Sequence, residues 1–260
     1  MSFYGKTFVF DGKASDIYGL FCAKRDASGV DASPLGSEVE VIEDYVNRRD
    51  TPYFYGVLFN SKLTFPISFF SEVPIPRERV SEISRWLFGL PTYRKLKIIQ
   101  DDMGNIYYNC MLTQNNLICI GNEVFGFEST VVCDSPWAYE NEFTFSKSNA
   151  AGNISVNNIS DNSRYTKPTI TLSFSSGQNN IGLTNTSDTG SSAILFTSVT
   201  SGEIITMDCN LRIISSNREN IQDRFNGKYL NLVQGINAIT LAGNFSNITI
   251  KYNPARKVGS

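Results

Sequence analysis

Asp101 and Asp102 are a close pair of carboxylates that directly follows a predicted strand over Lys95–Gln100. Two carboxylates that face one sugar can act as acid and as base or nucleophile in glycoside hydrolysis. Neighbouring residues of a regular strand point to opposite faces, so this pair could not flank one glycosidic bond. Because Met103–Asn105 follow with a glycine and an asparagine, we interpret the pair as part of a hairpin turn.

The sequence contains no histidine among its 260 residues. This excludes a Ser-His-Asp or Cys-His nucleophile and any zinc site that relies on imidazole. The sequence also has no glycine-rich phosphate loop, no GxSxG motif and no EF-hand loop. We therefore expect no catalytic residue, no metal and no cofactor, and hence a protein that is not an enzyme.

The cysteines are odd in number and have no CxxC spacing. Most lie in apolar, strand-like runs, where a free cysteine behaves as a small hydrophobic side chain. We expect buried, reduced thiols, and a reactive or metal-binding thiol is the less favoured alternative. The five are Cys22, Cys110, Cys119, Cys133 and Cys209.

Two aromatic clusters, Tyr53–Tyr55 and Tyr107–Tyr108, could stack against sugars or bases. Alternation along a strand sends some members of each cluster inward, so we assign those members to a core. A binding platform is the less favoured interpretation.

Arg48 and Arg49 follow an acidic stretch, Glu38–Asp44, and could dock carboxylates of a partner. An exposed loop pair is the simpler interpretation. Pro136 and Trp137 mark a junction in the chain, where Trp137 is either a sugar platform or, as we favour, a plug between two domains.

Charge and hydropathy narrow the class of protein. Lys and Arg number 23 against 25 Asp and Glu, for a net charge of -2. A protein whose main role is to bind nucleic acid needs a surplus of cationic side chains, so a nucleic-acid-binding protein is disfavoured. The start of the chain lacks a basic region followed by an apolar stretch, and the longest uncharged run, Tyr229–Ile250, carries too many amides to span a bilayer. We expect a soluble protein made in a reducing cytosol.

A composition change near Asp134 divides the chain, and Pro136 interrupts a continuous strand ladder there, so we place a domain boundary within residues 134–142. Before it, one amphipathic helix is predicted over Arg77–Phe88, with Pro76 and Gly89 at its ends. The remaining pattern predicts strands at Lys6–Phe10, Glu38–Ile42, Tyr53–Phe59, Lys62–Phe70, Lys95–Gln100, Ile106–Leu112, Leu117–Ile120 and Val124–Val132, with turns at Asn60–Ser61 and Gln114–Asn116.

After the boundary the pattern is β throughout, with turn residues at the spacing of an antiparallel sandwich. Residues 148–163 are polar with little periodicity, and we expect a long surface loop there. The expected strands are Thr169–Ser175, Ala193–Val199, Glu203–Asp208, Leu211–Ser215, Tyr229–Val233, Ala238–Leu241 and Asn247–Tyr252, with breaks at Ser201–Gly202, Asn226–Gly227, Gln234–Gly235 and Gly243–Asn244.

Short motifs also follow one another in a characteristic order along nearly the whole chain. In the first half they are Phe8–Ser15, Asp16–Leu20, Val39–Val41, Tyr53–Gly56, Ser84–Leu87, Arg94–Leu96, Asp101–Asp102, Asn105–Tyr108 and Cys133–Trp137. In the second half they are Gly202–Asp208, Leu232–Ile239 and Ile248–Arg256. Their order and spacing resemble the siphovirus tail component family, whose best-known members are the distal tail proteins of phages that infect Gram-positive bacteria.

The resemblance implies an all-β fold with one helix. Residues 1–135 would form an N-terminal, ring-forming β-sandwich, and residues 136–260 a C-terminal galectin-like jelly-roll sandwich. A projecting hairpin of the family corresponds best to Glu43–Phe70, which makes Arg48, Arg49, Tyr53 and Tyr55 candidate ring or partner contacts. Galectin chemistry leans on histidine, so we expect the second domain to be a docking surface.

The resemblance further implies a structural hub at the tail tip or baseplate of the virion, made in the cytoplasm of the host bacterium. Six copies would form a ring around the channel for DNA, without sequence-specific DNA binding and without membrane insertion. The implied partners are the tail tube protein, the tail-associated lysin or tail fibre, and receptor-binding proteins.

Two other functions compete with this one. A carbohydrate-binding module or adhesin would recognise host cell-wall polysaccharide through exposed aromatics in residues 140–260. A jelly-roll glycoside hydrolase is the third choice, because the acidic residues of that half are sparse and none pair obviously.

Overall fold

The computed structural model describes residues 5–23, 40–58, 62–89, 91–100, 105–190, 192–218 and 220–257. The chain divides into two compact units, one of Met1–Tyr139 with Arg256–Ser260 and the other of Glu140–Ala255. Within the described residues it is all-β with one α-helix, as the sequence predicts. Short strands β10 (Ala138–Tyr139) and β18 (Ala255–Arg256) lie at the two points where the chain passes from one unit to the other.

The first unit is built on a seven-stranded sheet with the order β2-β1-β7-β8-β9-β6-β3. Each neighbouring pair is antiparallel, and phenylalanines at alternate positions of the strands fill one continuous core. The strands are β1 (Phe8–Phe10), β2 (Lys13–Ala14), β3 (Phe21–Ala23), β6 (Thr64–Phe70), β7 (Arg94–Ile98), β8 (Tyr108–Ile120) and β9 (Glu123–Cys133), and a 3-10 turn, η1, covers Ser15–Tyr18.

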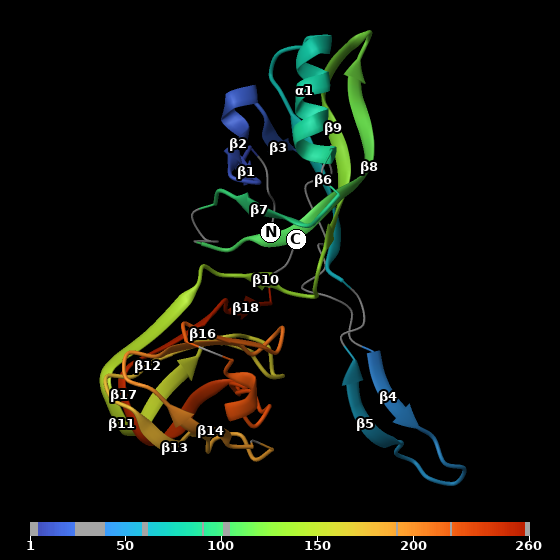
Figure 1. Ribbon diagram of the computed structural model, residues 1–260. Helices are drawn as coiled ribbons and strands as arrows, with labels where there is room; N and C mark the ends of the chain where they lie inside the picture. Colours follow the sequence, from blue (N-terminus) through green and yellow to red (C-terminus); the bar gives the residue numbers. More distant parts are fainter. Residues whose placement is uncertain are drawn as a thin grey trace. The chain divides into compact units, whose positions relative to one another are not determined.

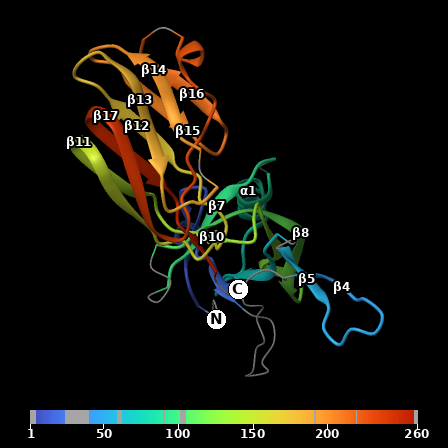
Figure 2. The same ribbon diagram turned by 90° about the horizontal axis from the view of Figure 1, so that it is seen from below.

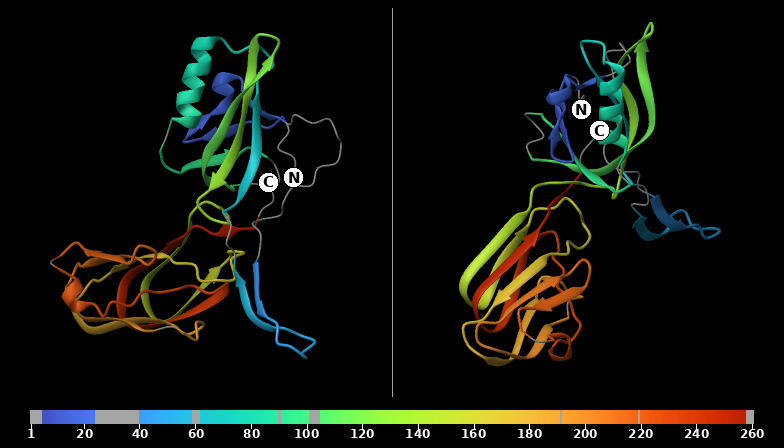
Figure 3. Two further views of the ribbon diagram at one scale, coloured as in Figure 1. Left: turned by 90° about the vertical axis from the view of Figure 1, so that its right-hand side faces the viewer. Right: turned by 45° about the horizontal axis from the view of Figure 1, so that its top comes forward.

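Helix α1 has the predicted bounds, Arg77–Phe88, and lies alongside this sheet (Figure 3). Ile83 and Leu87 on its buried side belong to the core. The Trp86 ring stacks on Phe8 at 5.9 Å between centroids, and its indole N–H donates to the Phe10 carbonyl oxygen at 3.0 Å. The helix is therefore held by both apolar packing and one long-range hydrogen bond.

The turn predicted at Gln114–Asn116 is wrong, because β8 runs through these residues without a break. Gln114 and Asn115 form a bulge: Thr113 pairs with Thr130, and Asn116 already pairs with Glu128. The polar residues in this part of the strand are exposed. Their polarity therefore reflects a bulge that faces solvent and not a turn. The turn interpretation of Asp101 and Asp102, and that of Asn60–Ser61, fall outside the described residues.

A second sheet of the first unit has only two strands, β4 (Glu40–Asp44) and β5 (Tyr53–Leu58), which pair with each other (Figure 1). Every residue of β4 is exposed, and so is most of β5. This hairpin therefore adds nothing to the core of its unit.

The second unit is a sandwich organised by one long strand, β17 (Gly235–Tyr252) (Figure 2). One edge of β17 pairs with β11 over nearly its whole length, while the other edge pairs first with β13 and then with β12. The sheet therefore diverges into two branches that enclose the second core. The other strands are β11 (Phe143–Asn158), β12 (Thr169–Ser173), β13 (Gln178–Asn185), β14 (Ile194–Val199), β15 (Ile204–Asp208) and β16 (Ile213–Ser216), and η2 covers Gln222–Arg224.

The loop predicted over residues 148–163 is wrong, since β11 occupies most of that stretch. Ala150, Ile154 and Val156 are buried at alternating positions, and the serines and asparagines between them face solvent. Within residues 148–158 the large apolar side chains are only Ile154 and Val156, so the two-residue period of this part of the strand is weak in the sequence.

The strands predicted at Ala238–Leu241 and Asn247–Tyr252 are one strand, and the predicted break between them is an irregularity. Gly243 adopts a φ of +112°, where the pairing of β17 with β11 shifts register. The strand predicted at Tyr229–Val233 is absent from the described residues apart from an isolated bridge from Leu232 to Thr166. Strand β13 is an element that sequence reasoning missed.

Four of the cysteines are buried, but Cys119 is exposed, which corrects the expectation for that residue. It lies near the end of β8, beyond the bulge, where the strand leaves the core. No helix among the described residues is long and apolar enough to cross a membrane.

Candidate functional site

The hairpin of β4 and β5 concentrates exposed apolar and aromatic side chains. Phe54 and Tyr55 each keep about two thirds of their surface accessible, and Tyr45 keeps still more. A soluble monomer rarely leaves such a contiguous group uncovered unless it serves an interaction. The exposed set is Val41, Ile42, Tyr45, Val46, Tyr53, Phe54, Tyr55 and Val57.

The prediction that some of Tyr53–Tyr55 would point into a core is wrong, because all three are exposed. Alternation buries one face of a strand only where another layer covers that face. Here side chains on both faces of the hairpin are exposed. A bulge adds to the effect: Ile42 pairs with Gly56 and Glu43 with Phe54, so Tyr55 is the extra residue.

The loop of the hairpin carries both candidate arginines, and both are exposed. Arg48 has a positive φ of 72°, and the Arg49 guanidinium lies over the Tyr53 ring at 3.8 Å from its centroid. This cation–π contact holds a positive charge beside the aromatic group. Arg48, Arg49, Tyr53 and Tyr55 thus all lie exposed on the hairpin, and Arg49 contacts Tyr53. Their partner role remains a prediction.

Two other candidate groups lie elsewhere in the first unit. Tyr107 and Tyr108 are both buried, and burial raises the pKa of Tyr108, so neither is a platform for a ligand. Pro136 and Trp137 are half-buried, and the Trp137 backbone N–H donates to the Ser135 hydroxyl oxygen at 3.2 Å.

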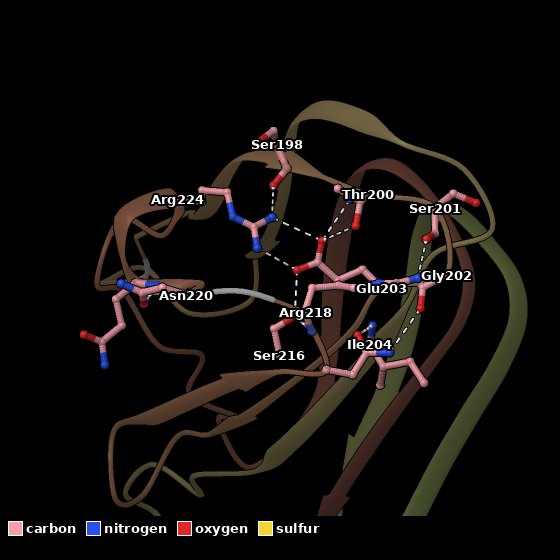
Figure 4. A network of polar contacts seen from close by, with 12 residues as sticks. Ser198, Thr200, Ser201, Gly202, Glu203, Ile204, Ser216, Arg218, Asn220 and Arg224 are labelled. Carbon is pink, nitrogen blue, oxygen red and sulfur yellow. Dashed lines mark hydrogen bonds and ion pairs between the residues drawn. The ribbon is translucent and has the colours of Figure 1, made fainter.

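A buried ionised carboxylate in the second unit is a feature that sequence reasoning missed (Figure 4). Glu203 is fully buried and directly precedes β15, which begins at Ile204. Arg224 of η2 donates to both of its carboxylate oxygens, at 2.8 and 3.1 Å. The other donors are the Thr200 backbone N–H at 2.8 Å, the Thr200 hydroxyl at 3.2 Å and the Ser216 hydroxyl at 2.7 Å.

This network sets the ionisation of Glu203. Burial alone would raise its pKa, but the hydrogen bonds from Arg224, Thr200 and Ser216 outweigh burial and lower the pKa to about 2. A carboxylate that is saturated with donors and stays ionised near neutral pH is poorly suited to general acid–base chemistry there. The arrangement joins the turn before β15, the end of β16 and η2, and we assign it a structural role.

The described residues contain no cluster of three or more His, Cys, Asp or Glu side chains that could hold a metal ion. The largest group of exposed apolar and aromatic side chains among the described residues lies on the hairpin of β4 and β5. The geometry defines a two-unit β protein with an exposed two-stranded hairpin.

The chain belongs to a phage tail protein family. Residues 3–135 match the family model for the phage tail protein N-terminal domain, and residues 136–252 match the model for the phage tail C-terminal domain. This confirms the tail family that the order of sequence motifs predicts. No curated protein matches the sequence.

Two solved structures share the fold over nearly the whole chain. One is the Dit protein (gp 19.1) of phage SPP1, described as a paradigm of the hub adsorption apparatus in phages that infect Gram-positive bacteria. It aligns with a TM-score of 0.70 at 13% identity and covers 96% of this chain and 99% of its own. The other is a chain of the phage P2 baseplate in its activated, Ca-containing conformation, with a TM-score of 0.54 at 9% identity, covering 98% of this chain and 100% of its own. The protein is thus a phage tail component with a hub-like fold.

Proposed function

We propose that this protein is the subunit of a hexameric ring at the tip of the phage tail, where it joins the tail tube to the tail-associated lysin or fibre and to receptor-binding proteins. The observation that carries the proposal is the structural match to SPP1 Dit, which includes both units of the chain. The tail family assignment of both halves supports it independently.

The first unit would form the ring, and the hairpin of β4 and β5 would bridge neighbouring copies. Its aromatic side chains are accessible on both faces, so burying them against another copy would remove much apolar surface from water. Arg48 and Arg49 would pair with carboxylates of the neighbour. A ring of identical subunits also satisfies the closed symmetry that most homo-oligomers adopt.

The role would be structural and not enzymatic. Both carboxylate oxygens of Glu203 already accept hydrogen bonds from neighbouring residues, and histidine is absent from the sequence. The second unit would present a docking surface to other tail proteins. Synthesis in the bacterial cytoplasm and a ring centre that passes DNA without reading its sequence complete the proposal.

The test is the mass and shape of the purified protein. Gel filtration coupled to light scattering over a wide concentration range should show a species of about 174 kDa, six times the 29.0 kDa of one chain. Negative-stain images of that species should show a sixfold ring with an open centre. A protein that stays monomeric at high concentration and beside purified tail tube would contradict the proposal, and binding to host cell wall by that monomer would favour the adhesin.

A further inference from the structure

Two buried cysteines of the first unit stand directly opposite each other on neighbouring strands. Cys110 near the start of β8 is the Cα partner of Cys133 at the end of β9, and the two strands lie side by side in the middle of the sheet (Figure 1). Neither side chain is accessible to solvent. Side chains of directly opposed residues project from the same face of the sheet, so both thiols enter the same core.

The backbone hydrogen bonds define the type of pair. The Asp134 N–H donates to the Asn109 carbonyl oxygen at 2.9 Å, so the adjacent pair, Asn109 with Asp134, is the hydrogen-bonded one. The Cys133 N–H points the other way and donates to the Leu63 carbonyl oxygen at 2.9 Å. Cys110 and Cys133 therefore form a non-hydrogen-bonded pair, in which the Cα atoms approach to about 4.5 Å.

We propose that Cys110 and Cys133 are an oxidative modification site, at which a cross-strand disulfide closes between β8 and β9. A Cα separation of about 4.5 Å falls within the range of about 4.4–6.8 Å that disulfides span. The Cβ atoms of directly opposed residues lie about 4.5–5.5 Å apart and are closer in non-hydrogen-bonded pairs, against about 3.8 Å in a disulfide, so closure needs only a small further approach of the two strands.

The oxidant would be a peroxide. One thiolate attacks a peroxide oxygen, the O–O bond breaks and a sulfenic acid forms. The other oxygen leaves as hydroxide, which takes up the proton that the thiol had lost and becomes water. The second thiolate then attacks the sulfenic sulfur, the S–S bond forms, and hydroxide leaves and takes up a proton. Two thiols and one hydrogen peroxide thus become one disulfide and two waters.

The fold controls when this reaction can occur. Burial raises the pKa of the Cys133 thiol to about 12 and that of Cys110 still further, so thiolate is scarce in the closed sheet. The β8–β9 ladder ends just beyond the pair, and opening of that end would admit the oxidant. The Cys119 thiol is exposed, so it should react with peroxide before the buried pair does, and it should not form a disulfide with either buried cysteine.

The test uses the full chain with Cys119→Ser, so that the exposed thiol cannot contribute. The folded protein is incubated with hydrogen peroxide at neutral pH, the peroxide is removed with catalase, and remaining thiols are alkylated in denaturant. Cleavage after glutamate separates the two cysteines, because Glu123 and Glu128 lie between them. Mass spectrometry should then find the Cys110 and Cys133 peptides joined, and the joined species should disappear on reduction.

Cys110→Ala and Cys133→Ala in the same background are the matched controls, and neither should yield a joined peptide. Cys22, which is opposite Phe69, and Cys209, which lies in the turn after β15, are also buried and should be recovered alkylated. The proposal is overturned if Cys110 and Cys133 are both recovered alkylated under conditions that fully oxidise Cys119 in the unaltered protein. It is also overturned if they are oxidised to sulfinic or sulfonic acid without becoming joined.

Discussion

At the scale of single residues, the Glu203 carboxylate joins segments that are far apart in the sequence. Its partners are the turn residue Thr200, Ser216 at the end of β16, and Arg224 in η2. A buried charge persists only when its hydrogen-bonding capacity is filled. Here five donor groups fill it, two from Arg224, two from Thr200 and one from Ser216. The network therefore fixes the path of the chain between β14 and β17.

Glu203→Gln should lower the free energy of unfolding by about 3 kcal/mol. Arg224 would lose its counter-ion, and the new amide NH2 group would lie against groups that are themselves hydrogen-bond donors. Urea unfolding followed by circular dichroism measures this change. Glu142→Gln is the matched control, since Glu142 makes an exposed ion pair with Lys251 at 2.8 Å, and it should cost less than about 1 kcal/mol. Equal losses in both variants would argue against a special role for Glu203.

The same residue predicts a pH dependence. The pKa of Glu203 is about 2 in the folded protein against 4.5 for an ordinary glutamate, so the unfolded chain binds the proton more tightly. The stabilisation is fully present above about pH 5 and is lost as the pH falls from there towards 2. Unfolding free energies at pH 6, 4 and 3 should fall more steeply for the unaltered protein than for Glu203→Gln. Parallel curves would show that this carboxylate is not the cause.

At the scale of elements, bulges shift the pairing register within the long strands without ending them. In β17 the register shifts between Leu241 and Phe245, and the Gln178 side chain repairs the gap. Its amide N–H donates to the Asn244 carbonyl oxygen at 2.6 Å, and its amide oxygen accepts from the Asn244 N–H at 2.8 Å. One side chain thus supplies both hydrogen bonds that a neighbouring strand would otherwise make.

Gln178→Ala should lower the free energy of unfolding by about 1–2 kcal/mol, because two backbone groups at the bulge lose their partners. Asn179→Ala, at the next exposed position of β13, is the control and should change stability by less than about 0.5 kcal/mol. Amide hydrogen exchange at Asn244 should also accelerate in the first variant alone. Unchanged exchange there would contradict the assigned role.

The elements also show what can be predicted from sequence. Helix α1 was predictable to the residue, because Pro76, Gly89 and an apolar stripe all mark the same segment. Strand β11 was not, because its serines and asparagines are typical of loops and only pairing with β17 makes it a strand. The Glu203–Arg224 pair could not be predicted either, because the two residues are 21 positions apart and meet only when the folded chain places η2 next to Glu203. The exposed hairpin was misjudged because alternation was assumed to imply a covered face.

At the scale of the whole molecule, assembly is the property that the exposed hairpin governs. Phe54→Ser combined with Tyr55→Ser should weaken ring formation at least about tenfold, because both rings lose apolar area that a neighbour would cover. Light scattering over a dilution series measures the change. Leu211→Ser is the control, since Leu211 is similarly exposed but belongs to the second unit.

The two hairpin substitutions should leave the fold intact, because neither side chain contributes to the core of its unit. Unfolding midpoints within about 2 °C of the unaltered protein would establish this. Rings that form equally well in the double variant would remove the hairpin from the subunit contact and leave the rest of the proposed function in place.

Strand β17 gives the second unit a mechanical character. It shares its ladders with β11, β12 and β13, so tension along its axis would have to shear three ladders at once. Shearing breaks many hydrogen bonds together, whereas peeling an edge strand breaks them one by one. Pulled along β17, the unit should therefore resist extension as a stiff block, and it should yield at lower force when pulled across an edge strand such as β16.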